Sequence, residues 1–90
     1  MLIMNINIEE LKKKIIYRAQ YRGTKEMDKL MSSFVKMYID KFDIKNLKDL
    51  EKLLEIDDNN LYSFYNGTNT RYIFEDNNVN RLFKNFTLKK

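Results

Sequence analysis

Apolar residues at helical spacing between positions 27 and 42 constrain the fold of this 90-residue chain more than any other feature. The stripe consists of Met27, Leu30, Met31, Phe34, Val35, Tyr38 and Phe42. Steps of three and four residues place such side chains on one face of a helix, and that face must be buried against other elements. Glu26 and Asp28 lie in the first turn, where free backbone amides stabilise carboxylates. The pattern predicts a helix of about four turns.

Shorter helical patterns lie on both sides of this stripe. They cover residues 7–21, 47–55, 61–65 and about 78–88. The chain has no proline and two glycines, which favours helices joined by short polar loops. The stretch after position 67 has no clear period, although Tyr72, Ile73 and Phe74 are candidates to anchor it on the core. We therefore predict an all-α fold, a compact single-domain bundle of four to five short helices over residues 1–90.

The connection before the central helix, from Tyr21 to Asp28, contains a glycine, a threonine and charges of both signs. Gly23 is predicted to end the preceding helix in a left-handed conformation, and Thr24 to cap the next one. A turn this short predicts an antiparallel helical hairpin. At the start of the first helix, Asn7 and Glu10 are predicted to form a capping pair.

The charged residues around this connection also have roles that need no ligand. Arg18 and Arg22 lie near the end of the first predicted helix, where the helix dipole favours cations. A local salt bridge between Arg22 and Glu26 is one alternative to a contact with a partner. Asp28 has an alternative role as a dipole residue in the first turn of the next helix.

The residue inventory excludes several kinds of chemistry. The chain has neither cysteine nor histidine, so it lacks a thiol nucleophile, an imidazole base and the usual zinc ligands. Gly23 and Gly67 are its only glycines, and no phosphate-binding glycine-rich loop is present. The two aspartates and two asparagines at residues 57–60 lack the spacing and the distant glutamate of a calcium loop, so no metal site is predicted. We expect a binding protein and not an enzyme.

The formal net charge is +4, with 17 basic residues interspersed among 13 acidic ones. A surface that follows nucleic-acid phosphates concentrates its cations on one side, so we expect no nucleic-acid partner. The alternative is a small basic helical module that binds nucleic acid or acts as an antitoxin-like regulator. That alternative predicts a one-sided cluster of Lys12, Lys13, Lys14 and Arg18.

The first six residues, Met1 to Ile6, are apolar but too few for a signal peptide or a membrane span. No arginine-rich transit segment is seen. We expect no membrane association, and a location in the cytoplasm of a bacterium or in the mitochondrial matrix of a eukaryote.

Four segments resemble one known family, in the same order and with matching spacing. They are residues 15–28 with Arg22, Gly23 and Glu26 as an Arg-Gly-x-x-Glu motif, the apolar run 30–34, the leucine pair and acidic turn within 50–58, and Leu61 to Phe64. Together they are similar to the small flavinylation factors of succinate dehydrogenase, which are the bacterial SdhE-type proteins and mitochondrial succinate dehydrogenase assembly factor 2. The resemblance covers residues 8–67. Phe64 stands where the family usually has tryptophan, and the C-terminal third shows no comparable match.

The resemblance implies a five-helix domain that binds the flavoprotein subunit of succinate dehydrogenase, or of the related fumarate reductase in some bacteria. Such proteins promote the covalent attachment of FAD to a histidine of the partner. No tightly bound cofactor is therefore expected in this chain, and FAD is acted on in the partner. A carrier of free FAD is a further alternative, which the missing phosphate loop disfavours. The residues expected to contact the partner are Arg22, Gly23, Glu26, Asp28, Arg18 and Tyr17.

In this interpretation the motif lies exposed at the connection between two helices. Arg22 offers a planar fork of donors to carboxylate or carbonyl groups. Gly23 lets two backbones approach closely, and Glu26 accepts hydrogen bonds or orients a partner group.

Overall fold

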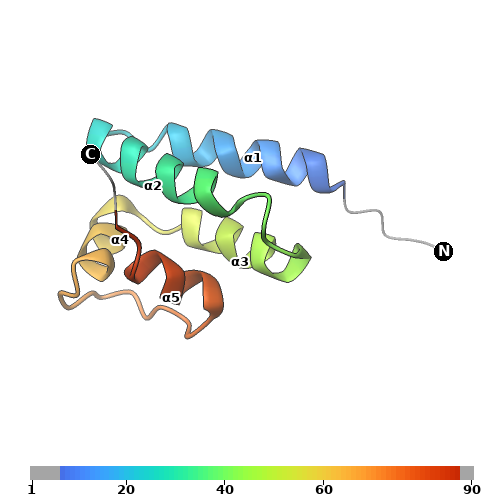
Figure 1. The fold of residues 1–90 in the computed structure, drawn as a ribbon. Helices are drawn as coiled ribbons and strands as arrows, with labels where there is room; N and C mark the ends of the chain where they lie inside the picture. Colours follow the sequence, from blue (N-terminus) through green and yellow to red (C-terminus); the bar gives the residue numbers. More distant parts are fainter. Residues whose placement is uncertain (1–6, 88–90) are drawn as a thin grey trace.

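The computed structural model describes residues 7–87, and these residues form five helices and no strand (Figure 1). The helices are α1 (Ile8–Gln20), α2 (Lys25–Tyr38), α3 (Ile44–Leu54), α4 (Asp58–Tyr65) and α5 (Asn78–Lys84). The predicted all-α, single-domain bundle of four to five helices is therefore confirmed. The apolar segment Met1 to Ile6, for which we expected no targeting role, lies outside the described residues.

Each helix begins after a residue whose side chain binds a free backbone amide. In every case this side chain accepts a hydrogen bond from the N–H three residues later. The N-cap residues are Asn7, Thr24, Asp43, Asp57 and Asn77. Because the first amides of a helix have no partner within the helix, these caps fix where each helix begins. The caps predicted at Asn7 and Thr24 are confirmed, and the Asn7 side chain also donates to Glu10 at 3.4 Å.

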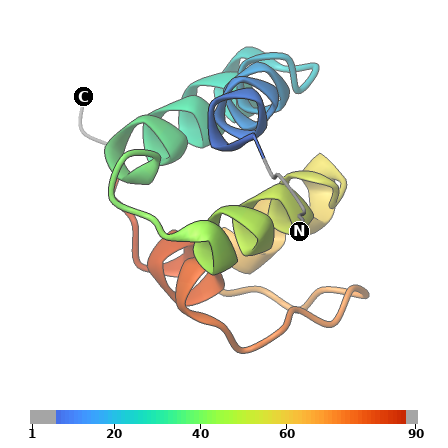
Figure 2. The same cartoon turned by 90° about the vertical axis from the view of Figure 1, so that its right-hand side faces the viewer.

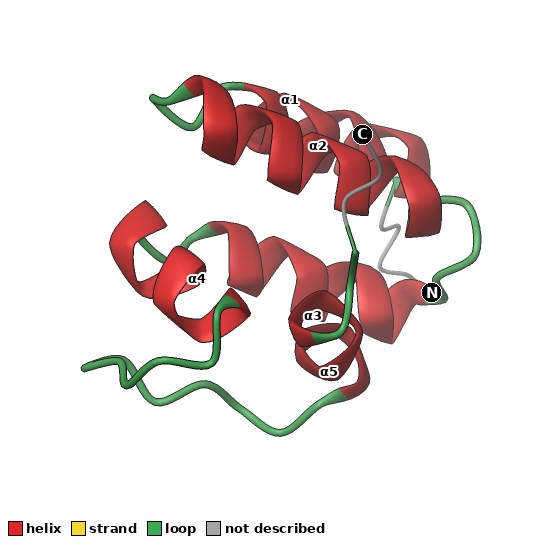
Figure 3. Ribbon diagram, turned by 60° about the vertical axis from the view of Figure 1, so that its left-hand side comes forward, coloured by secondary structure: helices red, strands yellow, loops and turns green. Residues whose placement is uncertain are grey.

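The helices form two layers (Figures 1 and 2). α1 and α2 form the predicted antiparallel hairpin, and this hairpin packs on a second layer of α3, α4 and α5. α3 contacts both α1 and α5, so it joins the two layers. Figure 3 shows the connection between α4 and α5 as a long loop at the edge of the second layer, away from the hairpin.

Phe34 of α2 lies at the centre of the core between the layers. Its side chain is fully buried. Its ring centroid lies 5.2, 5.3 and 5.4 Å from those of Tyr38, Phe83 and Phe86. The predicted apolar stripe is confirmed as the buried face of α2 from Met27 to Val35, and Tyr38 is partly buried against the core. Phe42 follows the end of this helix, and its ring stacks on Tyr38 with centroids 5.3 Å apart.

The last helix is shorter than predicted. We expected it to cover about residues 78–88, but α5 ends before Asn85, and the end of the expected range lies outside the described part of the chain. The backbone and the side chain of Asn85 both donate to the carbonyl oxygen of Arg81. The N–H of Phe86 then donates to the carbonyl oxygen of Phe83, only three residues back, so the four-residue hydrogen-bond pattern of the α-helix is not continued. Phe86 then enters the core, and its carbonyl oxygen accepts a hydrogen bond from the Tyr65 hydroxyl at 2.7 Å.

One aromatic contact anchors the loop between α4 and α5. Phe74 stacks on Phe64 with ring centroids 3.9 Å apart. Tyr72 is 45% exposed and Ile73 is 90% exposed. The expectation that all three neighbouring apolar residues anchor this loop is therefore correct for Phe74 and wrong for Ile73.

Replacing Phe34 by alanine should lower the free energy of unfolding by about 3–5 kcal/mol, because it leaves a cavity where aromatic rings of two layers meet. Met37 lies on the same helix and is 44% exposed, so Met37→Ala is a matched control. The control should cost less than about 1 kcal/mol. Urea unfolding followed by circular dichroism measures both variants, and equal costs would contradict the central position of Phe34.

Candidate functional site

Hydrogen bonds hold the α1–α2 turn (residues 21–24) at both ends. The N–H of Tyr21 donates to the carbonyl oxygen of Tyr17, and the N–H of Met27 donates to the Thr24 hydroxyl, both at 3.2 Å. Between these bonds, Gly23 has a φ of +117°, and the positive sign agrees with the predicted left-handed conformation. Gly23 lies two residues beyond Tyr21, which caps the end of α1. A Cβ at Gly23 would meet nothing within 4 Å. Glycine is therefore required here by the backbone conformation and not by lack of space.

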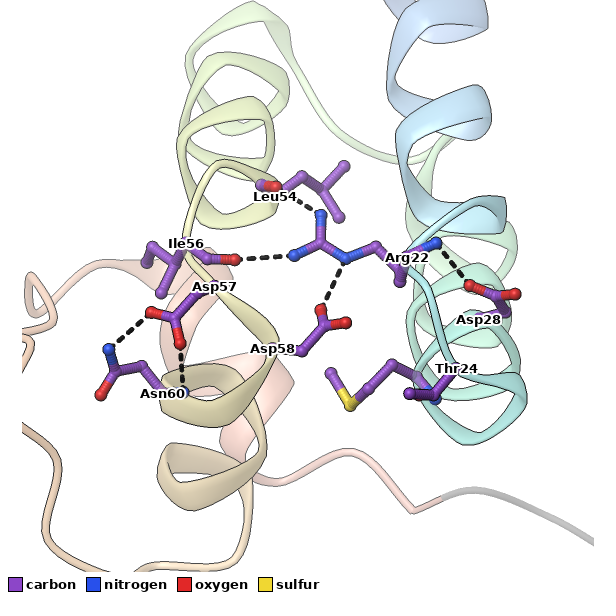
Figure 4. A network of polar contacts seen from close by, with 9 residues as sticks. Arg22, Thr24, Asp28, Leu54, Ile56, Asp57, Asp58 and Asn60 are labelled. Carbon is purple, nitrogen blue, oxygen red and sulfur yellow. Dashed lines mark hydrogen bonds and ion pairs between the residues drawn. The ribbon is translucent and has the colours of Figure 1, made fainter.

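The side chain of Arg22 joins this turn to the α3–α4 turn (residues 55–57), as Figure 4 shows. Its Nε donates to Oδ1 of Asp58 at 2.9 Å, and its Nη2 donates to the carbonyl oxygen of Ile56 at 2.7 Å. Its Nη1 donates to the carbonyl oxygen of Leu54. The Arg22 side chain is only 10% exposed. All three guanidinium nitrogens are therefore engaged within the chain.

The end of α3 explains why an arginine with a largely buried side chain is stable at this place. α3 ends at Leu54, and the last carbonyl groups of a helix have no partner within the helix. They also carry the negative end of the helix dipole, which attracts a cation. Asp58, in the first turn of α4, adds a full negative charge. Arg22 therefore exchanges its hydration for charge-assisted hydrogen bonds, which offset the cost of burying its charge.

One expectation and one alternative for Arg22 are wrong. We expected its donor fork to lie exposed in the turn, but the fork is bound to the end of α3. We also considered a local salt bridge to Glu26, whereas the carboxylate that pairs with Arg22 is Asp58. Asp28 also has an internal contact, because its Oδ1 accepts a hydrogen bond from the backbone N–H of Arg22.

The exposed side of the motif consists of Gly23 and Glu26. Within residues 7–87 the carboxylate of Glu26 forms no ion pair. Tyr17 is 64% exposed and Tyr21 is 67% exposed, and their ring centroids lie 4.7 Å apart. The solvent side of this region therefore offers a carboxylate, an open stretch of backbone and a pair of aromatic rings.

Basic residues of α1 form ion pairs with acids on other elements. The pairs are Lys12 with Asp40, Lys14 with Glu51 and Arg18 with Glu55, at 3.2, 3.0 and 3.6 Å. A nucleic-acid-binding face presents its cations to the phosphates from one side. These acids neutralise much of the basic cluster that the nucleic-acid alternative predicts, and so weaken that alternative.

A cleft of about 580 Å³ lies beside α3, between the α3–α4 turn and the loop before α5. Its lining includes the carboxylates of Asp49, Glu55, Asp57 and Glu75, with Lys52 as the basic residue. Carboxylates repel the diphosphate of FAD. The cleft therefore does not fit the alternative in which this chain carries free FAD.

Hydrogen bonds in the folded protein stabilise the ionised form of the Asp57 carboxyl. Hydrogen bonds from the side chain and the backbone N–H of Asn60 lower the pKa of the Asp57 carboxyl below its usual value. The ionised carboxylate caps α4 and so fixes the start of the helix that carries Asp58.

Within residues 7–87, no group of three or more His, Cys, Asp or Glu side chains is placed to hold a metal ion. No helix in the same part of the chain combines the length and the apolar character needed to cross a membrane.

The fold and the site define a small all-α protein that presents a short motif at one end of a helical hairpin. A family model described as flavinator of succinate dehydrogenase matches residues 13–87. The chain belongs to this family of succinate dehydrogenase assembly factors. The match includes α5, which lies beyond the residues 8–67 on which the sequence resemblance rested. No curated protein and no solved structure matches the chain.

Sequence reasoning did not select Asp58 as a site residue. Asp58 lies 36 positions from Arg22, so no local pattern pairs the two. We assigned residues 57–60 to capping, and Asp57 does cap α4. One sequence signal could have identified Asp58. The family resemblance includes an acidic turn directly after the predicted helix at residues 47–55, and this turn supplies a carboxylate that Arg22 could bind.

Replacing Arg22 by lysine should lower the free energy of unfolding by about 2 kcal/mol, because one ammonium group cannot serve two carbonyls and a carboxylate at once. Arg18→Lys is the matched control, since the single contact of Arg18 with Glu55 is long and partly exposed. It should cost less than about 0.5 kcal/mol. Chemical denaturation at neutral pH measures both. An Arg22→Lys protein as stable as the parent would show that the planar fork is not needed.

Proposed function

We propose that this protein binds the flavoprotein subunit of succinate dehydrogenase and promotes the covalent attachment of FAD to it. The family match over residues 13–87 carries this proposal, because it covers the motif formed by Arg22, Gly23 and Glu26. The residue inventory agrees with it. A chain without histidine leaves the flavin-accepting histidine to the partner.

Gly23, Glu26 and Tyr17 are the proposed direct contacts. The open space around Gly23 leaves room for a partner backbone to approach closely. The exposed carboxylate of Glu26 accepts hydrogen bonds from amides or basic side chains of the partner. Tyr17 contributes an exposed ring, and tyrosine is enriched among the residues that dominate binding energy at interfaces.

The other three predicted contact residues have a different place in this proposal. Arg22 and Asp28 act by fixing the α1–α2 turn, since their polar groups already bind within the chain. Arg18 lies at the periphery of the contact surface, with a side chain 38% exposed and a contact of 3.6 Å with Glu55.

The proposed mechanism is a population shift in the partner. Docking of the α1–α2 turn favours the partner conformation in which flavin and histidine are aligned, and their proximity then accelerates bond formation. This chain contributes binding energy and shape and has no catalytic role of its own. FAD is a substrate held by the partner, which is the flavoprotein of succinate dehydrogenase or of fumarate reductase. The protein therefore works where that subunit folds, in the bacterial cytoplasm or the mitochondrial matrix.

Gly23→Arg should remove most covalent FAD incorporation into the flavoprotein subunit, because the new side chain occupies the space that the partner approaches. Gly67→Arg is a matched control, since Gly67 also has a positive φ, of +77°, and open space around it. Both variants carry backbone strain of about 1–2 kcal/mol. Fluorescence of flavin that remains on the denatured partner measures the covalent product. Equal losses in the two variants would assign the effect to strain and contradict docking at Gly23.

Glu26→Ala should raise the partner concentration needed for half-maximal flavinylation by about tenfold, the size expected for one lost charge-assisted hydrogen bond. Glu9→Ala is the control, because Glu9 is also an exposed glutamate in the first turn of a helix. Thermal unfolding should be similar for both variants. A Glu26→Ala protein with the half-saturating concentration of the parent would remove Glu26 from the proposed contacts.

A further inference from the structure

We infer that Asp58 is a positioning residue for the α1–α2 turn and that it acts through Arg22. The inference rests on the proposed function, because it concerns the same turn. Asp58 belongs to α4, in the second layer, and not to the hairpin that carries Gly23 and Glu26. Its carboxylate nevertheless binds the side chain of the residue directly before Gly23 (Figure 4).

Arg22 is held from two directions. Its backbone N–H donates to Asp28, at the beginning of α2. Its guanidinium donates to Asp58, to the carbonyl of Leu54 at the end of α3 and to the carbonyl of the turn residue Ile56. Rotation of the Arg22 backbone would break one of these two sets of hydrogen bonds. The turn is therefore fixed on the N-terminal side of Gly23 by both helical layers.

Asp58 is the one side chain among the acceptors of the Arg22 guanidinium within residues 7–87, so a substitution there can remove a hydrogen bond to Arg22. The other two acceptors are backbone carbonyl groups. The carbonyls persist in any variant, whereas the carboxylate does not. Without it, the Nε of Arg22 loses its partner, and the planar fork is no longer fixed in orientation.

Asp57 allows a positioning role to be separated from a purely stabilising one. A loss of stability lowers the fraction of folded molecules, whereas a loss of positioning changes the turn in molecules that are folded. Asp57 caps the same helix directly before Asp58, and its side chain binds Asn60 and not Arg22. Asp57→Ala is therefore a destabilised control with the contact to Arg22 intact.

The first measurement is the ¹⁵N–¹H NMR spectrum of the folded protein without a partner. Asp58→Ala should shift the amide signals of Gly23 and Thr24 clearly more than Asp57→Ala does, because only the former releases the guanidinium. Asp58→Asn should restore both signals toward their parental positions, since the amide oxygen of asparagine is an acceptor at nearly the same place.

The second measurement is the rate of covalent FAD incorporation at increasing concentrations of the flavoprotein subunit, at a temperature where all variants are folded. Asp58→Ala should raise the half-saturating concentration about fivefold, with the rate at saturation retained, because a misplaced turn weakens docking. Asp58→Asn should largely restore the parental value, and Asp57→Ala should not change it.

Unchanged Gly23 and Thr24 signals in Asp58→Ala would overturn the inference. The inference would also be overturned if Asp58→Ala shifted these signals but kept the half-saturating flavoprotein concentration of the parent protein. If the parent itself fails to promote flavinylation, the proposed function fails, while the NMR comparison still decides whether Asp58 positions the turn. Should the alanine variant not fold, Asp58→Ser keeps a polar residue at the start of α4 and takes its place, with the same expected results.

Discussion

The largely buried guanidinium of Arg22 determines how the two helical layers meet at the end of the molecule that carries the motif. Apolar packing around Phe34 holds the layers together, but the hydrophobic effect has no direction. A guanidinium is planar, and its donors have fixed positions. When it binds Asp58, the carbonyl of Leu54 at the end of α3 and the carbonyl of Ile56 in the α3–α4 turn, it sets the orientation of the α1–α2 turn relative to the second layer. The same contacts satisfy carbonyl groups that the end of a helix leaves unpaired.

A turn fixed in this way suits the proposed docking to a partner. A surface that is ordered before it binds avoids part of the entropic cost of association. Thr24 and Asp28 fix the turn from the side of α2, and Arg22 fixes it from the side of α3. The proposed contact surface is therefore held by elements that are far apart in the sequence.

Features that depend on neighbouring residues could be predicted from the sequence, and features that depend on distant contacts could not. The buried face of α2 and the cap at Thr24 follow from spacing and residue type within a few positions. The pairing of Arg22 with Asp58 spans 36 positions, and an arginine beside a glycine in a short turn gives no sign of burial. The early end of α5 was likewise not predicted, and the carbonyl oxygen of Phe86 just beyond it accepts a hydrogen bond from Tyr65, 21 positions earlier in the chain.

The residues of the motif divide according to whether their bonding capacity is already used within the chain. Arg22 donates to three acceptors beyond its own turn, so it belongs to the scaffold. Gly23 supplies a backbone conformation, with a φ of +117° and free space around it. Glu26 is exposed and has no ion-pair partner within residues 7–87, so its carboxylate is available to a second protein. The three positions of the motif therefore have a supporting side chain, a glycine-specific backbone conformation and a proposed contact, and we expect substitutions at them to impair the protein for three different physical reasons.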